Sequence, residues 1–287
     1  MTQTVLGSTV SLWPYPVKSM MGEELNASEV TKSGLLGDRA YALVDKSDGK
    51  VASAKNPRKW PGLFECRAML SEVPRTGVKL PSVRITLPDG TIVSSEQPSL
   101  NQILSEVLKR EVKFSALPDV RTATAEEYWP DIEGLEHRET VTDFGLPEGT
   151  FFDCGHVHLL TTATLDRLRA LYPQGRFEVR RFRPNIVVEV TEGEKDFVEN
   201  AWIGQTLAIG DTVRLSITGP CPRCVMTTLP QGDLPKDAGV LRTAAQHNGA
   251  NVGVYASILQ DGKIRRGDSV RQVAWRLNQR ATHVGGE

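Results

Sequence analysis

Residues 212–228, TVRLSITGPCPRCVMTT, join a strand-like run to a Gly-Pro turn and to the only clustered cysteines of the chain, Cys221 and Cys224. A thiolate is the reactive, metal-binding form of cysteine, and a positive charge such as that of Arg223 lowers the pKa of a neighbouring thiol. Soft thiolates bind zinc, iron–sulfur clusters, copper(I) and heavier, polarisable metals. Cys224 is therefore a candidate metal ligand, redox thiol or nucleophile. The competing interpretation is a buried thiol pair that packs beside a strand end.

The surroundings of the motif disfavour two kinds of site. A structural zinc site needs four ligands, and neither a second CxxC nor a pair of histidines follows. A redox CxxC starts a helix in a thioredoxin-like unit, whereas VMTTLPQG after Cys224 is β-like and then turn-like. His156 and His158 would share one strand face, which is more typical of a half-exposed strand than of a metal site. Motifs of hydrolases and nucleotide-binding folds (G-x-S-x-G, Walker A, G-x-G-x-x-G) are not found in the sequence.

Short β-like runs alternate with turns on both sides of this segment, for example RAYALVD before KSDGK and SVRITL before PDG. This spacing predicts a mainly β fold with a few helices, arranged as two β-rich domains. We expect an N-terminal, barrel-like domain over residues 1–120, a second β-barrel domain over residues 121–275 and a tail over residues 276–287.

Apolar residues on one face predict a helix over residues 99–110, with Ser99 as its N-cap, and a second helix over residues 164–172 capped by Thr162 or Thr164. The stretch 118–147 is polar and acidic, which predicts a linker or a long surface loop.

The composition is that of an ordinary globular protein of 287 residues, 39% hydrophobic and 24% charged. With a formal net charge of −1, the protein has no overall electrostatic field that would attract nucleic acid or an anionic membrane. A membrane helix needs about 20 apolar residues in a row, and the sequence contains no such run. The N-terminus also lacks the pattern of a secretory signal. We therefore expect a cytoplasmic protein whose four cysteines are thiols, with neither nucleic acid nor membrane as a partner.

Basic residues form a second group of candidate site residues, besides the cysteine motif. Arg180, Arg181 and Arg183 cluster before a strand-like run, with Asn185 close behind. Planar guanidinium groups match phosphate or carboxylate, although a solvated basic strand edge would have the same composition. Lys18, Ser19 and Arg39 lie beside turns, where side chains can point into a shared cleft. Taken singly, Lys18 fits a solvated lysine equally well, and Arg39 fits a surface pair with Asp38.

Together these segments resemble the MOSC family, in the branch with an N-terminal β-barrel domain that includes the mitochondrial amidoxime-reducing component and its bacterial relatives. The resemblance covers nearly the whole chain, in order. Its main segments are LWPYPVKSMMGEEL (12–25), GLLGDRAYALVD (34–45), RFRPNIVVE (181–189) and PCPRCVMTTLP (220–230).

The resemblance implies a molybdenum cofactor (Mo-molybdopterin) in a cleft between the two domains. Cys224 would be the protein ligand of the metal and the catalytic residue. The remaining positions implied as cofactor-binding are Lys18, Ser19, Arg39 and Arg183 at the pterin and its phosphate, Asn185 in the surrounding loop, Asp153 and Cys154 along the cofactor, and Arg223 beside the thiolate.

The implied activity is a molybdenum-dependent oxidoreductase that reduces N-hydroxylated small molecules by two-electron oxo transfer. Because motifs for flavin, NAD or iron–sulfur binding are lacking, a separate ferredoxin-, flavoprotein- or cytochrome-type protein would donate the electrons. Two alternatives stay open. One is a carrier that binds or delivers the cofactor, also in sulfurated form, without turnover; the other is a zinc or dithiol protein built on Cys221 and Cys224.

Overall fold

The computed structural model describes residues 4–117, 123–131, 133 and 137–274. Seven of its strands form a closed barrel, in the spatial order β1, β12, β11, β15, β14, β13, β17. The predicted mainly β fold with a few helices is confirmed. The barrel strands are β1 (Thr4–Leu12), β11 (Val157–Thr161), β12 (Ile186–Val190), β13 (Thr206–Ile209), β14 (Val213–Pro222), β15 (Asn251–Gln260) and β17 (Ser269–Val273).

The first strand of the chain closes this barrel. β1 pairs antiparallel with β12 on one side and with β17 on the other. Its burial alternates along the strand, as expected when one face packs on the barrel core. A short sheet of β2 (Ala27–Thr31), β3 (Gly34–Leu35) and β16 (Gly262–Arg265) adds Val30, Leu35 and Ile264 to the same core. Residues from the predicted N-terminal domain thus complete the C-terminal barrel, while the boundaries at 120 and 275 stay predictions.

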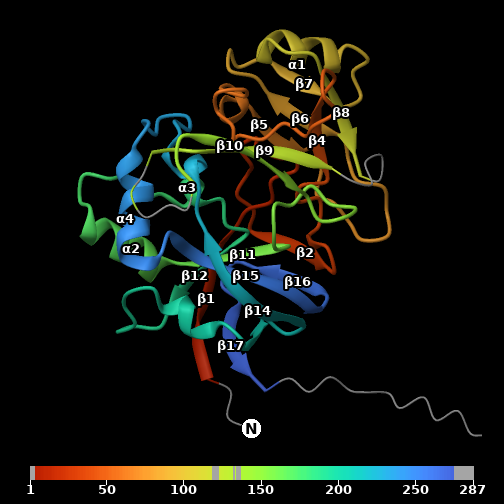
Figure 1. The fold of residues 1–287 in the computed structure, drawn as a ribbon. Helices are drawn as coiled ribbons and strands as arrows, with labels where there is room; N and C mark the ends of the chain where they lie inside the picture. The colour runs from red at the N-terminus through yellow and green to blue at the C-terminus, as the bar shows by residue number, and fades with distance from the viewer. Residues whose placement is uncertain (1–3, 118–122, 132, 134–136, 275–287) are drawn as a thin grey trace, which may run out of the picture.

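The N-terminal lobe has its own core, separate from that of the barrel. Figure 1 shows this lobe in the upper half and the barrel in the lower half. The lobe contains β4 (Tyr41–Asp45) paired with β8 (Val112–Ala116), a sheet of β5 (Arg67–Leu70), β6 (Val83–Thr86) and β7 (Ile92–Ser94), the short helix η1 (Leu63–Glu65) and α1 (Leu100–Leu108). Helix α1 matches the prediction and buries Leu100, Leu104 and Leu108, although the Ser99 side chain makes no capping hydrogen bond.

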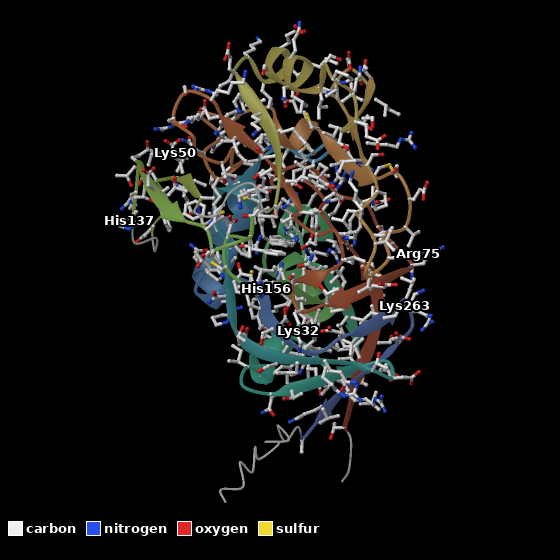
Figure 2. The ribbon with its side chains drawn as sticks, turned by 90° about the vertical axis from the view of Figure 1, so that its right-hand side faces the viewer. Lys32, Lys50, Arg75, His137, His156 and Lys263 are labelled. Carbon is white, nitrogen blue, oxygen red and sulfur yellow. The ribbon has the colours of Figure 1, made fainter. Side chains whose placement is uncertain are left out.

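The acidic stretch expected as a linker or loop contains a β-hairpin instead, in the part of it that the structure describes. β9 (Thr124–Trp129) pairs antiparallel with β10 (Thr140–Gly145). Its acidic residues are used in ion pairs, since Lys50 contacts Glu126 at 2.9 Å and Asp143 at 2.7 Å. Lys50 lies beside this hairpin in Figure 2. Acidic composition alone therefore misled the prediction, because these carboxylates face lysines of the N-terminal lobe.

The helices of the C-terminal half lie along one flank of the barrel in Figure 1. They are α2 (Thr162–Leu171), α3 (Val179–Phe182), α4 (Ala238–Asn248), η2 (Val198–Trp202) and η3 (Val225–Thr228). The predicted cap of α2 was wrong: Thr161, the last residue of β11, is the N-cap, and its hydroxyl accepts a hydrogen bond from the Thr164 amide. Within the described residues, none of these helices has both the length and the apolar character required to cross a bilayer.

Candidate functional site

One cavity of about 80 Å³ brings together cationic side chains from both halves of the chain. Lys18 and Arg39 come from the N-terminal half, and Arg183 and Arg223 from the C-terminal half. Among the described lining residues, Asp153 alone carries a carboxylate. The excess of positive charge in a mostly buried setting favours an anionic ligand.

Lys18 is held at the cavity wall by two acceptors. Its ammonium donates to the Phe151 carbonyl at 2.9 Å and forms an ion pair with Asp153. Burial lowers the pKa of Lys18, and the charge of Asp153 opposes that shift. Burial alone would raise the pKa of Asp153, but Lys18 and Lys55 hold it well below its usual value. Lys18 is therefore buried and paired, and it is not the solvated side chain that composition alone allowed.

Tyr15 stands between two guanidinium groups of the site. Its ring centroid lies 4.5 Å from Arg39 and 4.1 Å from Arg183, as in cation–π contacts. The Tyr15 amide donates to Asp38 at 2.7 Å, and the hydroxyl donates to the Pro184 carbonyl at 3.2 Å. Burial raises the pKa of Tyr15 and lowers that of Arg183 to about 10. A neutral ring thus spaces two cations that would otherwise repel each other.

Three residues of the cavity have left-handed backbones that non-glycine residues rarely adopt: Ser19 (φ 64°), Arg39 (φ 47°) and Arg183 (φ 53°). Hydrogen bonds hold two of them in place. The Ser19 hydroxyl accepts from the Ala54 amide at 3.0 Å, and Arg183 donates to the Met20 carbonyl at 2.7 Å. Backbone strain of this kind concentrates at functional sites, where the surrounding structure enforces it.

Asn185 ties the two halves together behind the cationic residues. Its amide nitrogen donates to the Asp38 carboxylate at 2.9 Å and to the Trp13 carbonyl at 3.2 Å. Its oxygen accepts from the His158 amide at 3.1 Å. The carboxylate of Asp38 also binds Arg39. Asn185 therefore fixes the loop that carries Arg39.

The two clustered cysteines lie in different surroundings. Cys221 lines the cavity, and Arg223 donates to its sulfur at 2.8 Å. Burial opposes a thiolate there, yet His158 and Arg223 lower the pKa of Cys221 to about 6. Cys224 is half-buried, packs against the N-terminal core and does not line the cavity, and burial raises its pKa to about 12.

Lys55 connects Cys224 to the cavity. Its ammonium lies 3.1 Å from Glu127 and 3.7 Å from Asp153. Burial would lower the pKa of Lys55, but its interactions with Asp153, Cys224 and Glu127 raise it. In return, Lys55 is the strongest influence that lowers the pKa of the Cys224 thiol. Cys224 thus lies at the edge of the charged site, on the side that faces the N-terminal lobe.

The structure brings eight of the nine predicted site residues to this one cavity and leaves Cys224 beside it. The eight that line it are Lys18, Ser19, Arg39, Asp153, Cys154, Arg183, Asn185 and Arg223. Their roles toward a cofactor stay predictions.

The arginine cluster of the sequence is divided between different roles. Arg180 forms exposed ion pairs with Glu178 and Asp233, while Arg181 is fully buried and donates to carbonyls, including that of Pro235 at 2.8 Å. The alternative of a basic strand edge was wrong, because Arg180 and Arg181 belong to the short helix α3 and Arg183 is its C-cap.

Several residues at or beside the cavity were not among the predicted site residues. Tyr15 and Tyr255 belong to ordinary strand-like or turn-like runs, and Lys55 stands alone. His158 was expected on a half-exposed strand face with His156, but it is buried in β11, where its ring lies 6.2 Å from that of Tyr255. His156 precedes the strand and packs on Phe152, near the middle of the molecule in Figure 2.

The chain is similar to several known proteins in sequence or in structure. The chain is 25% identical over 306 aligned positions to mitochondrial amidoxime reducing component 2 of Macaca fascicularis, covering 92% of this chain and 83% of that protein. The Homo sapiens protein of the same name is 24% identical over 303 positions, with the same coverage. Among solved structures, the YUAD protein of Bacillus subtilis aligns with 96% of this chain and 98% of that chain at 10% identity and a TM-score of 0.46.

Two family patterns follow each other along the sequence. The MOSC N-terminal beta barrel domain matches residues 6–124. The MOSC domain matches residues 147–271. The chain therefore belongs to the MOSC family and carries a MOSC N-terminal beta barrel domain ahead of its MOSC domain.

Proposed function

We propose that the protein binds a molybdenum cofactor at the cationic cavity and reduces N-hydroxylated small molecules. The observation that carries the proposal is the convergence of Lys18, Arg39, Arg183 and Arg223 on one cavity from both halves of the chain. Relatives named amidoxime reducing component, aligned over most of the chain, support the reductase assignment.

The residues present fit an anionic cofactor. The Arg223 Nε is buried and has no hydrogen-bond partner among the described residues. A buried donor without an acceptor is costly, and a phosphate oxygen would satisfy it. The cavity of about 80 Å³ has room for a small anionic group such as the phosphate of that cofactor.

Each side chain would have a distinct task toward the bound group. Lys18, Ser19, Arg39 and Arg183 would hold the pterin and its phosphate, Asp153 and Cys154 would line it, Asn185 would fix the loop and Arg223 would balance the charge. Cys224 would ligate the metal, which requires its proton to leave, because metals bind the thiolate. When bound, the cofactor would supply the two-electron reduction of the substrate, with electrons from a separate ferredoxin-, flavoprotein- or cytochrome-type donor.

A second hollow favours a reductase over a carrier. A groove of about 510 Å³ lies on the other side of η3, since Val225 and Thr228 line the groove whereas Met226 lines the cavity. Its walls include Trp60 and Phe64, which belong to the core on which Cys224 packs. Apolar, partly aromatic hollows of this size bind small organic molecules. A carrier would not need such a site beside the metal ligand.

The test begins with protein expressed in the presence of molybdate. We expect stoichiometric molybdenum and pterin, and reduction of benzamidoxime with reduced methyl viologen as the electron donor. The Cys224→Ser variant should lose turnover, and the Cys221→Ser variant should still contain molybdenum.

The other outcomes are equally informative. Bound cofactor without turnover in the wild-type protein would reject the reductase and favour the carrier. Loss of molybdenum in Cys221→Ser, together with its retention in Cys224→Ser, would move the ligand to the thiol that lines the cavity. Protein that contains neither molybdenum nor pterin after expression with molybdate would reject the proposal.

A further inference from the structure

Two cysteines line the same small cavity although they are far apart in sequence. Cys221 is fully buried near the end of β14, and Cys154 is exposed in the segment that precedes β11. Burial favours the neutral form of both thiols, and a side-chain hydrogen bond with Tyr255 opposes that effect at each of them. Both sulfurs therefore lie within reach of one tyrosine hydroxyl.

The backbone keeps these groups together. β14, β15 and β11 are neighbours in the barrel, with Gly219 opposite Tyr255 and Tyr255 opposite His158. Gly155, next to Cys154, packs so closely on Tyr255 that an added Cβ would lie 2.7 Å from its ring. The loop that carries Cys154 is thus seated directly on the tyrosine beside Cys221.

Cys221 differs chemically from the other three thiols. The Arg223 guanidinium donates to its sulfur at 2.8 Å, which stabilises a thiolate. Burial raises the pKa of Cys66 to about 11, that of Cys224 to about 12 and that of Cys154 in the same direction, whereas that of Cys221 falls to about 6. At neutral pH, Cys221 is the cysteine in nucleophilic form.

We propose that Cys221 is a site of oxidation by hydroperoxides and that Cys154 converts the oxidised sulfur into a disulfide across the cavity. The exposed Cys154 marks the side from which a molecule as small as hydrogen peroxide reaches the buried sulfur. This inference goes beyond the proposed reductase function and does not depend on it.

The reaction has two balanced steps. The Cys221 thiolate attacks one peroxide oxygen, so that an S–O bond forms, the O–O bond breaks and hydroxide leaves, which gives a sulfenic acid. The Cys154 thiol, after loss of its proton, then attacks that sulfur; the S–S bond forms, the S–O bond breaks and water leaves. Two thiols are oxidised by two electrons, and one hydrogen peroxide is reduced to two waters.

Cys224 is not the partner, although it belongs to the same CxxC. Its side chain packs on the core of the N-terminal lobe and does not line the cavity. The residue between them, Arg223, directs its guanidinium to Cys221 and to the Phe182 carbonyl.

The experiment uses the reduced full-length protein and hydrogen peroxide as the probe. Non-reducing peptide mapping by mass spectrometry should find a Cys154–Cys221 disulfide. Cys221 should be oxidised at least about tenfold faster than Cys66, whose thiol is protonated at neutral pH. In Cys154→Ser, dimedone should trap the sulfenic acid on Cys221, and in Cys224→Ser the disulfide should still form.

Three results would overturn the inference: a Cys221–Cys224 disulfide, oxidation of Cys221 no faster than that of Cys66, or a stable sulfenic acid on Cys221 in the wild-type protein while Cys154 remains free. The circular dichroism spectrum and melting temperature of each variant establish that it is folded. Cys154→Ala serves as a second variant should Cys154→Ser fail that criterion.

Discussion

At the scale of single residues, Arg223 combines a buried guanidinium group with an incomplete set of hydrogen-bond partners among the described residues. Two of its nitrogens are used within the protein, by Cys221 at 2.8 Å and by the Phe182 carbonyl at 2.9 Å, while Nε is buried without a described partner. Burial opposes its charge, and the Cys221 thiolate raises its pKa instead. Arg223 and Cys221 therefore stabilise each other in charged form, and removal of one should be visible in the titration of the other.

We predict that Arg223→Gln raises the pKa of Cys221 above its present value of about 6, because the guanidinium that stabilises the thiolate is lost. Absorbance of the thiolate at 240 nm, titrated with the other three cysteines replaced by serine, measures the midpoint. Arg180→Gln is the control, since Arg180 is paired with Glu178 outside the cavity. An unchanged midpoint in Arg223→Gln would contradict the assignment.

We also predict a pH-dependent stability change from Glu199→Gln. The carboxylate is buried and accepts from Thr161 and Thr164, and its second oxygen has no partner among the described residues. Burial raises the pKa of Glu199 above the ordinary value of 4.5. The folded protein thus binds this proton more tightly than the unfolded chain does, so the contribution to stability is complete below pH 4.5 and is lost as pH rises through the folded pKa.

Glutamine removes this loss, so the variant should be more stable than the wild type at pH 7.5 by roughly 1–3 kcal/mol, with a smaller gain at pH 4. Urea denaturation at the two pH values measures the difference. Glu192→Gln, at an exposed position, provides the matched control. A gain of the same size at both pH values would contradict the explanation.

At the scale of elements, the site depends on close approach between neighbouring barrel strands. Gly253 in β15 has φ 82°, and an added Cβ would lie 2.3 Å from the His158 Nε2 and 2.5 Å from the Leu159 carbonyl oxygen. The same histidine ring nitrogen lies 2.9 Å from the Val252 carbonyl. Glycine at this point allows His158 to remain inside the barrel wall beside the cavity.

Gly253→Ala should therefore destabilise the protein by about 3 kcal/mol or more, because backbone strain and a steric clash add together. Gly90→Ala isolates the strain, since Gly90 has a similar φ of 87° and no atom within 4 Å of the added Cβ. That control should cost about 1 kcal/mol. Chemical denaturation measures both values, and equal losses would show that contact with His158 is not the cause.

At the scale of the whole molecule, the N-terminal part of the chain contributes to both lobes. β1 lies between β12 and β17, and Leu12, Val30 and Leu35 are buried in the barrel core. The cavity has the same character, since its cations come from both halves. Neither the barrel nor the site is complete without the first part of the chain.

We predict that residues 121–287 expressed alone do not unfold cooperatively, because β12 and β17 lack their shared partner and the barrel core is exposed. Co-expression with residues 1–36 should restore a sharp transition, measured by circular dichroism and calorimetry. If the fragment alone melted like the full chain, β1 would be dispensable for the barrel.

Local patterns predicted the strands, α1 and the body of α2, because hydrophobic periodicity acts over a few residues. The same patterns failed for the hairpin of β9 and β10, whose acidic residues are satisfied by lysines of a different segment. The cap of α2 shifted to Thr161 because the preceding strand runs directly into the helix.

By itself, the sequence determined the mainly β class, the family resemblance and a set of residues for the site, since these depend on composition, short-range order and motif. Only the tertiary structure decided that β1 closes the barrel, that Tyr15 separates Arg39 from Arg183 and that Cys221 faces the cavity while Cys224 packs beside it. The reason is physical: these contacts join residues far apart in the chain, such as the Tyr15 hydroxyl and the Pro184 carbonyl, 169 positions apart. Such contacts form only when the packed cores of both lobes fix the distance between them.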